Sequence, residues 1–113
     1  MSTARIIPDD PLSFIRRCVA ERRVLWTYHV NMRMKNRFIP RRVILESVSE
    51  YEIIESYPED KYLPSYLVWV RHQDSVYHVL FAVDVAGENV RVVTAYRPNP
   101  EKWSQNLKRR RES

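Results

Sequence analysis

The chain has 113 residues, 44% of them hydrophobic, and nineteen Lys and Arg against fourteen Asp and Glu give a net charge of +5. This length and apolar content fit one folded domain and exclude a disordered chain. The single glycine excludes glycine-rich phosphate loops, and the single cysteine excludes an internal disulfide and a zinc site of the cysteine-cluster type.

Further expectations about location and partners follow from composition. No apolar run is long enough to span a membrane, and the N-terminus lacks the apolar core of a signal peptide. We therefore expect a cytoplasmic protein without a membrane partner, and we expect no cofactor and no metal. Fifteen of the nineteen cations are arginine, which suits contacts with phosphate, so the composition favours a polyanionic partner such as nucleic acid.

The first half of the chain has the apolar spacing of helices. Asp10 followed by Pro11 is typical of a helix start, because aspartate caps free N–H groups and proline suits the first turn. Thr27 can cap a second helix, and Pro40 begins a third. The predicted helices cover residues 11–24, 28–37 and 40–50.

The second half changes to strand-like segments rich in aromatic and β-branched residues. The predicted strands cover residues 51–58, 66–72, 76–84 and 90–98. We expect an α+β fold with N-terminal helices packed on an antiparallel sheet. The tail ends in Lys108 and three arginines, and it predicts a short helix carrying Trp103.

A cationic ridge is predicted on the second helix. His29, Arg33 and Arg37 recur every four residues, so they fall within an arc of roughly 80°. The apolar stripe of the same helix lies on another face and consists of Val30, Met34 and Phe38. Such a ridge is either a solvated basic surface or one wall of a site.

Two strand residues suggest that a site exists. If the last two strands meet at a turn near Gly87, His78 faces Tyr96 and Leu80 faces Thr94, although a slip of one residue would reverse the facing. A strand histidine more often fills a core than performs catalysis. In the expected register, however, an imidazole, a phenol and a hydroxyl converge on one face of the sheet.

Other polar residues give weaker signals. Glu52 and Glu55 have the pattern of charges at a sheet edge, and His72 that of an exposed turn residue. The spacing of the three histidines matches no metal motif. Cys18 lies on the apolar side of a helix, so a cysteine nucleophile is not expected.

Histidine, arginine and tyrosine together are the groups that RNA cleavage without a metal requires. A base takes the proton of the 2′-hydroxyl, a cation holds the charge that develops on the phosphate, and an acid protonates the leaving oxygen. The same residues also serve an RNA-binding module without catalysis. A protein-interaction module that docks an acidic partner is the third alternative.

Five segments in order, "YHVNMRMKNR", "FIPRRVI", "IIESYPEDKYLPSYLV", "YHVLFAVD" and "VVTAYRPNPEKW", resemble the prokaryotic family of domains of unknown function numbered 4258. The resemblance covers about residues 25–103. It leaves residues 1–24 as an N-terminal extension, expected to be one helix, and residues 104–113 as a basic tail. The family is grouped with RelE-like toxins in the Barnase–EndoU–Colicin–RelE fold, which implies helices on a curved antiparallel sheet of about four strands.

The activity that this resemblance implies is metal-independent RNA cleavage by a toxin or toxin-like endoribonuclease. The implied catalytic residues are His29, Arg33, His78 and Tyr96. The implied substrate-binding residues are Arg37, Thr94 and Arg97. The implied partners are RNA, at the ribosome or free, and an antitoxin protein. The alternative is a non-catalytic RNA-binding, ribosome-binding or protein-interaction module on the same scaffold.

Overall fold

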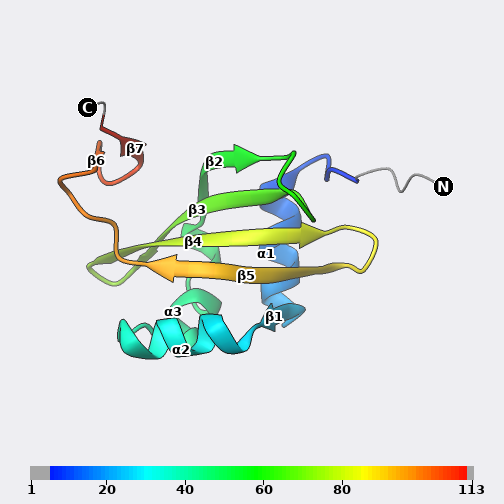
Figure 1. Cartoon of the computed structure of the whole chain (residues 1–113), viewed down its shortest axis with the longest axis horizontal. Coiled ribbons are helices and arrows are strands. Elements are labelled where there is room, and N and C mark those ends of the chain that lie inside the picture. Colours follow the sequence, from blue (N-terminus) through cyan, green and yellow to red (C-terminus); the bar gives the residue numbers. More distant parts are fainter. Residues whose placement is uncertain (1–5, 112–113) are drawn as a thin grey trace.

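The computed structural model describes residues 6–111 (Figure 1). The helices are α1 (Pro11–Ala20), α2 (Tyr28–Asn36), α3 (Arg41–Leu45) and the 3₁₀ helix η1 (Val48–Glu50). The strands are β1 (Val24–Trp26), β2 (Glu52–Tyr57), β3 (Ser65–His72), β4 (Ser75–Asp84), β5 (Asn89–Tyr96), β6 (Trp103–Ser104) and β7 (Arg109–Arg110). Among the described residues, no helix is long and apolar enough to cross a membrane.

The main sheet has the strand order β1-β5-β4-β3-β2. Strands β2 to β5 form the predicted antiparallel meander. The sheet nevertheless has five strands and is mixed, because β1 joins β5 in parallel, with Val24 opposite Val90. The α+β class is thus confirmed, while the fifth strand was not predicted. A strand of three residues is too short to show the alternation on which such predictions depend.

The predicted register between β4 and β5 is confirmed. His78 lies opposite Tyr96, and Leu80 lies opposite Thr94. Beyond Leu80 the ladder shifts by one residue, which leaves Val93 without a partner opposite it in β4. Because of this shift, the apolar residues that follow it in both strands still point to the same face of the sheet.

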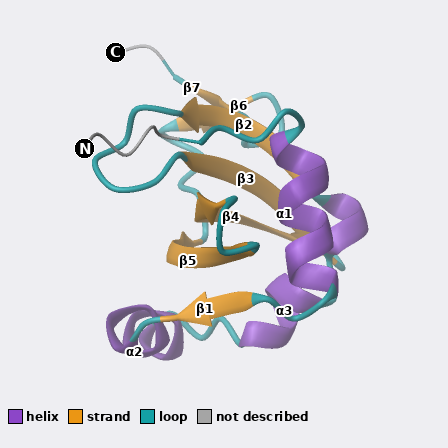
Figure 2. Ribbon diagram, turned by 90° about the vertical axis from the view of Figure 1, so that its right-hand side faces the viewer, coloured by secondary structure: helices purple, strands orange, loops and turns teal. Residues whose placement is uncertain are grey.

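The helices α1 and α3 cover one face of the sheet, which we call the helix-covered face (Figure 2). The core lies there, and α1 contributes the fully buried Ile15 and Val19. Each such side chain stabilises the fold by about 1.5–3 kcal/mol. The segment predicted as an N-terminal extension is therefore part of the core. The opposite face, which carries His78 and Thr94, is called the helix-free face.

The helix ends depart from the predicted bounds. The first helix ends at Ala20 and the second at Asn36, and in each case a left-handed residue follows, Arg22 (φ 62°) or Phe38 (φ 56°). In the second, the Ile39 N–H donates to the Met34 carbonyl at 2.8 Å, which is a Schellman end.

This helix end changes the predicted apolar stripe. Phe38 was predicted to be buried, but it is 83% exposed, and Ile39 occupies the core in its place. The third predicted helix is also shorter, because it ends at Leu45 and the chain then turns at Ser47 before η1. Serine favours helix ends because its hydroxyl competes for backbone hydrogen bonds.

The tail was predicted to form a short helix, and this prediction is wrong. Strands β6 and β7 pair in a hairpin instead, with Trp103 opposite Arg110. Trp103 is 4% exposed, so the hairpin is packed onto the rest of the fold. Contacts with the sheet outweigh the local helix preference of this charged segment.

Candidate functional site

His78 is fully buried on the helix-free face, between Tyr96 and the C-terminal hairpin. Its Nε2 lies 2.6 Å from the carbonyl oxygen of Leu107, which only accepts hydrogen bonds. Nε2 therefore carries the proton, and Nδ1 is left as an acceptor. The Tyr96 hydroxyl lies 3.3 Å from Nδ1 and donates to it. The Trp103 ring packs edge-on against the His78 ring, with the two ring centroids 4.4 Å apart.

Burial sets the protonation of this pair. It lowers the pKa of His78 below its ordinary value, while the hydrogen bond with the Leu107 carbonyl and the charge of Glu55 act in the opposite sense. Burial also raises the pKa of Tyr96. At neutral pH the pair is therefore a neutral imidazole and a neutral phenol, which is suited to exchanging one proton.

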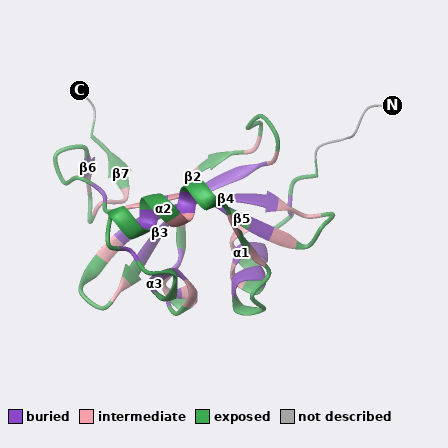
Figure 3. Cartoon of the chain, turned by 60° about the horizontal axis from the view of Figure 1, so that its bottom comes forward, coloured by how far each residue is buried: buried purple, intermediate pink, exposed green. Residues whose placement is uncertain are grey.

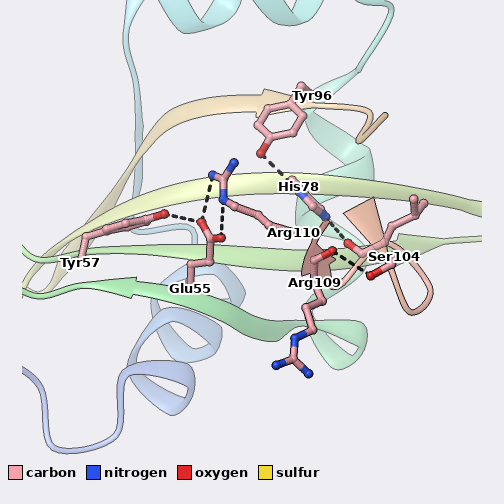
Figure 4. Close-up of polar contacts among 8 residues, drawn as sticks. Glu55, Tyr57, His78, Tyr96, Ser104, Arg109 and Arg110 are labelled. Atoms are coloured by element: carbon pink, nitrogen blue, oxygen red, sulfur yellow. Dashed lines mark hydrogen bonds and ion pairs between the residues drawn. The ribbon is translucent and has the colours of Figure 1, made fainter. Parts of the chain in front are cut away.

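A carboxylate and a guanidinium lie beside this pair (Figure 4). The carboxylate of Glu55 accepts two hydrogen bonds from Arg110, at 2.6 Å from Nε and 3.2 Å from Nη2. The Tyr57 hydroxyl donates a third hydrogen bond to it. The Glu55 side chain is only 19% exposed. These groups, with His78 and Tyr96, form what we call the sheet cluster.

The charge state of Glu55 depends on these partners. Partial burial acts to raise the pKa of its carboxyl, but the hydrogen bonds from Arg110 and Tyr57 outweigh it and hold the pKa below the ordinary value. The hydrogen bond with Glu55 raises the pKa of Tyr57. Glu55 is thus an ionised acceptor at neutral pH, and both groups that bind it stay protonated.

Arg37, at the end of α2, connects that helix to the helix-free face. Its guanidinium donates to the Ala95 carbonyl at 2.8 Å and lies 3.5 Å from the Thr94 hydroxyl. Arg97, predicted to bind substrate, donates instead to the carbonyls of Arg37 and Phe38. Arg97 therefore holds the end of α2 in place against β5.

His29 and Arg33 on α2 and Arg37 at its C-cap are all exposed and stand four residues apart; they are called the α2 ridge. Figure 3 shows that much of the α2 ribbon is exposed. Within residues 6–111, the side chain of Arg33 has neither a hydrogen bond nor an ion pair. The His29 ring lies edge-on to the Tyr28 ring, with the two ring centroids 6.1 Å apart. His29 lies eight residues before Arg37, which corresponds to about 12 Å along the helix axis.

The structure therefore brings the predicted residues together in two pairs. His78 meets Tyr96, and Arg37 meets Thr94 on the neighbouring part of β5. His29 and Arg33 lie on the preceding turns of α2, farther from the His78 ring than Arg37. The predicted residues thus fall into one pair, the buried His78 with the half-buried Tyr96, and an exposed set on α2 and at its end.

Glu55, Tyr57 and Arg110 were not predicted as site residues. Glu55 and Tyr57 stand two residues apart on β2, so their shared face was readable, although Glu55 was interpreted as an edge charge. No sequence signal indicated Arg110, which lies 55 residues from Glu55. In the described part of the chain, no group of three or more His, Cys, Asp or Glu side chains is placed to hold a metal ion.

Comparison with known proteins gives one match. A family described as a domain of unknown function (DUF4258) matches residues 26–97, well over half of the chain. The match includes the α2 ridge, Glu55, His78 and Tyr96, and it ends before the C-terminal hairpin. Neither a curated protein nor a solved structure matches the chain.

Proposed function

Since the chain belongs to the DUF4258 family, we propose that it is a toxin-like endoribonuclease that binds RNA along the α2 ridge and cleaves it at His78 and Tyr96 without a metal. One observation carries this proposal. Arg37 belongs to the ridge and also contacts Thr94, two residues before Tyr96 on β5. A polyanion lying on the ridge is thereby directed toward the sheet cluster.

Charge supports RNA as the ligand. Residues 22–45 contain seven Lys and Arg and no Asp or Glu. RNA neutralises such a surface by releasing its condensed counterions, and this gives affinity without any sequence preference. Tyr28 is 73% exposed beside His29, and an exposed aromatic ring among cations offers a surface on which a base stacks.

The chemistry proposed for the sheet cluster balances without a metal. The 2′-oxygen of the RNA forms a bond to the adjacent phosphorus, and the bond from phosphorus to the 5′-oxygen breaks. His78 Nδ1 takes the 2′-hydroxyl proton, and the Tyr96 hydroxyl protonates the leaving oxygen. The proton on His78 then returns to Tyr96 through the contact that joins them. The products are a 2′,3′-cyclic phosphate and a 5′-hydroxyl.

The cation that this reaction needs is Arg37. Its guanidinium has five N–H donors, and the Ala95 carbonyl and the Thr94 hydroxyl leave others open for the phosphate oxygens. Preorganised donors of this kind stabilise the charge that develops in the transition state. His29 and Arg33, farther along the ridge, hold the phosphates that follow.

A second candidate function is RNA or ribosome binding without cleavage. It is favoured by the engagement of both ring nitrogens of His78, which Tyr96 and the Leu107 carbonyl occupy. On this alternative, the sheet cluster is a purely structural network.

We also propose that an antitoxin protein competes with RNA for the α2 ridge, which it contacts through acidic side chains. The RelE-like grouping of the fold, and the sheet curvature that this grouping implies, belong to the proposal of a toxin-like endoribonuclease.

Titration of a labelled single-stranded RNA tests the binding surface. We expect Arg33→Ala to weaken binding and to reduce the slope of log affinity against log salt by about 0.7, the value for one lost phosphate contact. Arg17→Ala is the matched control, because Arg17 is an exposed helix arginine on α1, at the helix-covered face. Equal losses in both variants would show nonspecific charge attraction and would contradict the proposed surface.

A further inference from the structure

We propose that the C-terminal hairpin, residues 103–110, is a removable cover that closes the His78 site in the chain's resting state. This inference rests on the proposed function for its catalytic meaning, since it assigns a regulation to the same site. The hairpin lies outside residues 26–97, which the family match covers. It lies beside β2, at the sheet edge opposite β1 (Figures 1 and 2).

Backbone carbonyls of the hairpin accept hydrogen bonds from two side-chain donors at the site. The Leu107 carbonyl accepts from His78 Nε2 at 2.6 Å, and the Asn106 carbonyl accepts from Trp69 Nε1 at 2.9 Å. Trp69 is opposite His78 in the β3–β4 ladder, so the two donors are neighbours on the helix-free face. With Trp103 packed against the imidazole, no part of His78 is exposed.

Two ion pairs fasten the hairpin to β2. Lys108 Nζ lies 2.6 Å from the Glu52 carboxylate, and Arg110 binds the Glu55 carboxylate through two nitrogens. The two cations also lie over the rings of Trp69 and Trp103. Three of these four ion-pairing side chains are at least 35% exposed. Attachment of this kind is weak enough to be reversible.

The turn that reaches His78 is conformationally strained. Gln105, Asn106 and Leu107 all have positive φ angles, of 51°, 61° and 66°. Left-handed backbone is unfavourable for Gln105 and Leu107, although asparagine tolerates it, and a run of such residues persists only where surrounding contacts impose it. The strain is released when the hairpin leaves the sheet, which lowers the cost of opening.

Opening changes the chemistry of the sheet cluster. Nε2 of His78 loses its carbonyl partner, and the imidazole and the Tyr96 hydroxyl become accessible to a ligand. Glu55 loses the guanidinium of Arg110 and becomes a free carboxylate beside Tyr57. A polyanion such as RNA favours this change, because it competes with Glu52 and Glu55 for Lys108 and Arg110.

Labelling with diethyl pyrocarbonate, which modifies accessible imidazoles, tests the cover on the full chain. Peptide mass spectrometry reports each histidine separately, and the exposed His29 serves as the internal reference. We expect Lys108→Glu/Arg110→Glu to raise the labelling rate of His78 about tenfold, because it turns two attractions into repulsions. Arg109→Glu/Arg111→Glu is the matched control. It changes the charge equally, and within the described residues neither arginine has an ion pair, while the one side-chain hydrogen bond of Arg111 goes to the Pro100 carbonyl and not to the sheet.

The cover is confirmed if His78 is protected in the wild type and in the control but is labelled in the Lys108 and Arg110 variant, with His29 unchanged. If the double variant does not fold, Trp69→Phe removes the donor to Asn106 while keeping an aromatic ring at the position, and it is expected to raise the labelling rate of His78 as well. Continued protection of His78 in the folded variants would overturn the proposal. The readout contains no RNA, so a site that opens without cleaving RNA would refute the proposed function and leave the cover intact.

Discussion

The Nδ1 atom of His78 lies 3.3 Å from the hydroxyl of Tyr96, and the two residues face each other in the ladder between β4 and β5. The Leu107 carbonyl fixes the tautomer of the imidazole, so that Nδ1 is the acceptor. The pair is therefore set for proton exchange at Nδ1 while its other nitrogen is occupied by the hairpin. The site is both chemically suited to acid–base work and closed.

Replacing His78 is expected to destabilise the fold. His78→Ala removes a fully buried ring that has two hydrogen bonds, so the free energy of unfolding should fall by about 2–4 kcal/mol. His29→Ala, at an exposed position, should change it by less than about 0.5 kcal/mol. Urea denaturation measures both. A similar small loss in both variants would contradict the burial of His78.

The pKa of His78 predicts a pH dependence of stability. Burial lowers this pKa in the folded chain, so the unfolded chain binds the proton more readily below the ordinary value near 6.5. Stability is therefore fully present above pH 6.5 and declines as the pH falls from 6.5 toward the folded pKa. Unfolding free energies between pH 7.5 and 5.5 should show this decline in the wild type. The same decline in His78→Gln would contradict the assignment.

The left-handed Phe38 predicts that glycine is more stable than alanine at this position. Phe38 is 83% exposed and follows the Schellman end of α2, where glycine is the preferred residue. Phe38→Gly should exceed Phe38→Ala in stability by about 1 kcal/mol, because both remove the ring but only glycine removes the left-handed strain. Thermal unfolding of the two variants makes the comparison. An alanine variant of equal or greater stability would show that the turn is unstrained.

Arg37 predicts a difference between arginine and lysine. Its guanidinium contacts the Ala95 carbonyl and the Thr94 hydroxyl through Nη1 alone, so Nε and Nη2 are left for a phosphate, whereas a lysine ammonium has only one nitrogen for all three. Arg37→Lys keeps the charge, so RNA affinity should fall by less than about threefold. The cleavage rate should fall by at least about tenfold, because donors aimed at the developing charge are lost. Equal small effects on the RNA affinity and on the cleavage rate would show that Arg37 has no role in the proposed chemistry.

Much of this site was predictable from local pattern. Strand alternation placed His78 and Leu80 on one face, and the position of the turn near Gly87 fixed the register with Tyr96 and Thr94. The cap residues Asp10 and Thr27 were also identified correctly, and each accepts the hydrogen bond expected of a helix cap. These features depend on neighbours in the sequence or on a single turn.

The features that were missed depend on contacts between distant segments. The ion pair between Glu55 and Arg110 joins β2 to β7 across 55 residues of sequence, and the segment around Arg110 has the sequence of a solvated charged tail. The hairpin that carries Arg110 exists because Trp103 and Lys108 find partners on the sheet. No periodicity within residues 103–110 encodes those partners, so local reasoning favoured a helix.

The central claim is cleavage of RNA at His78 without a metal, and the most direct measurement is the end chemistry of RNA fragments formed in excess EDTA. The wild type should produce fragments that end in a 2′,3′-cyclic phosphate. Lys108→Glu/Arg110→Glu should produce them faster, and a folded His78→Gln variant should not produce them. If the wild type and the Lys108 and Arg110 variant both fold and bind RNA but release no cyclic phosphate, the chain is an RNA-binding module and the proposed cleavage is wrong.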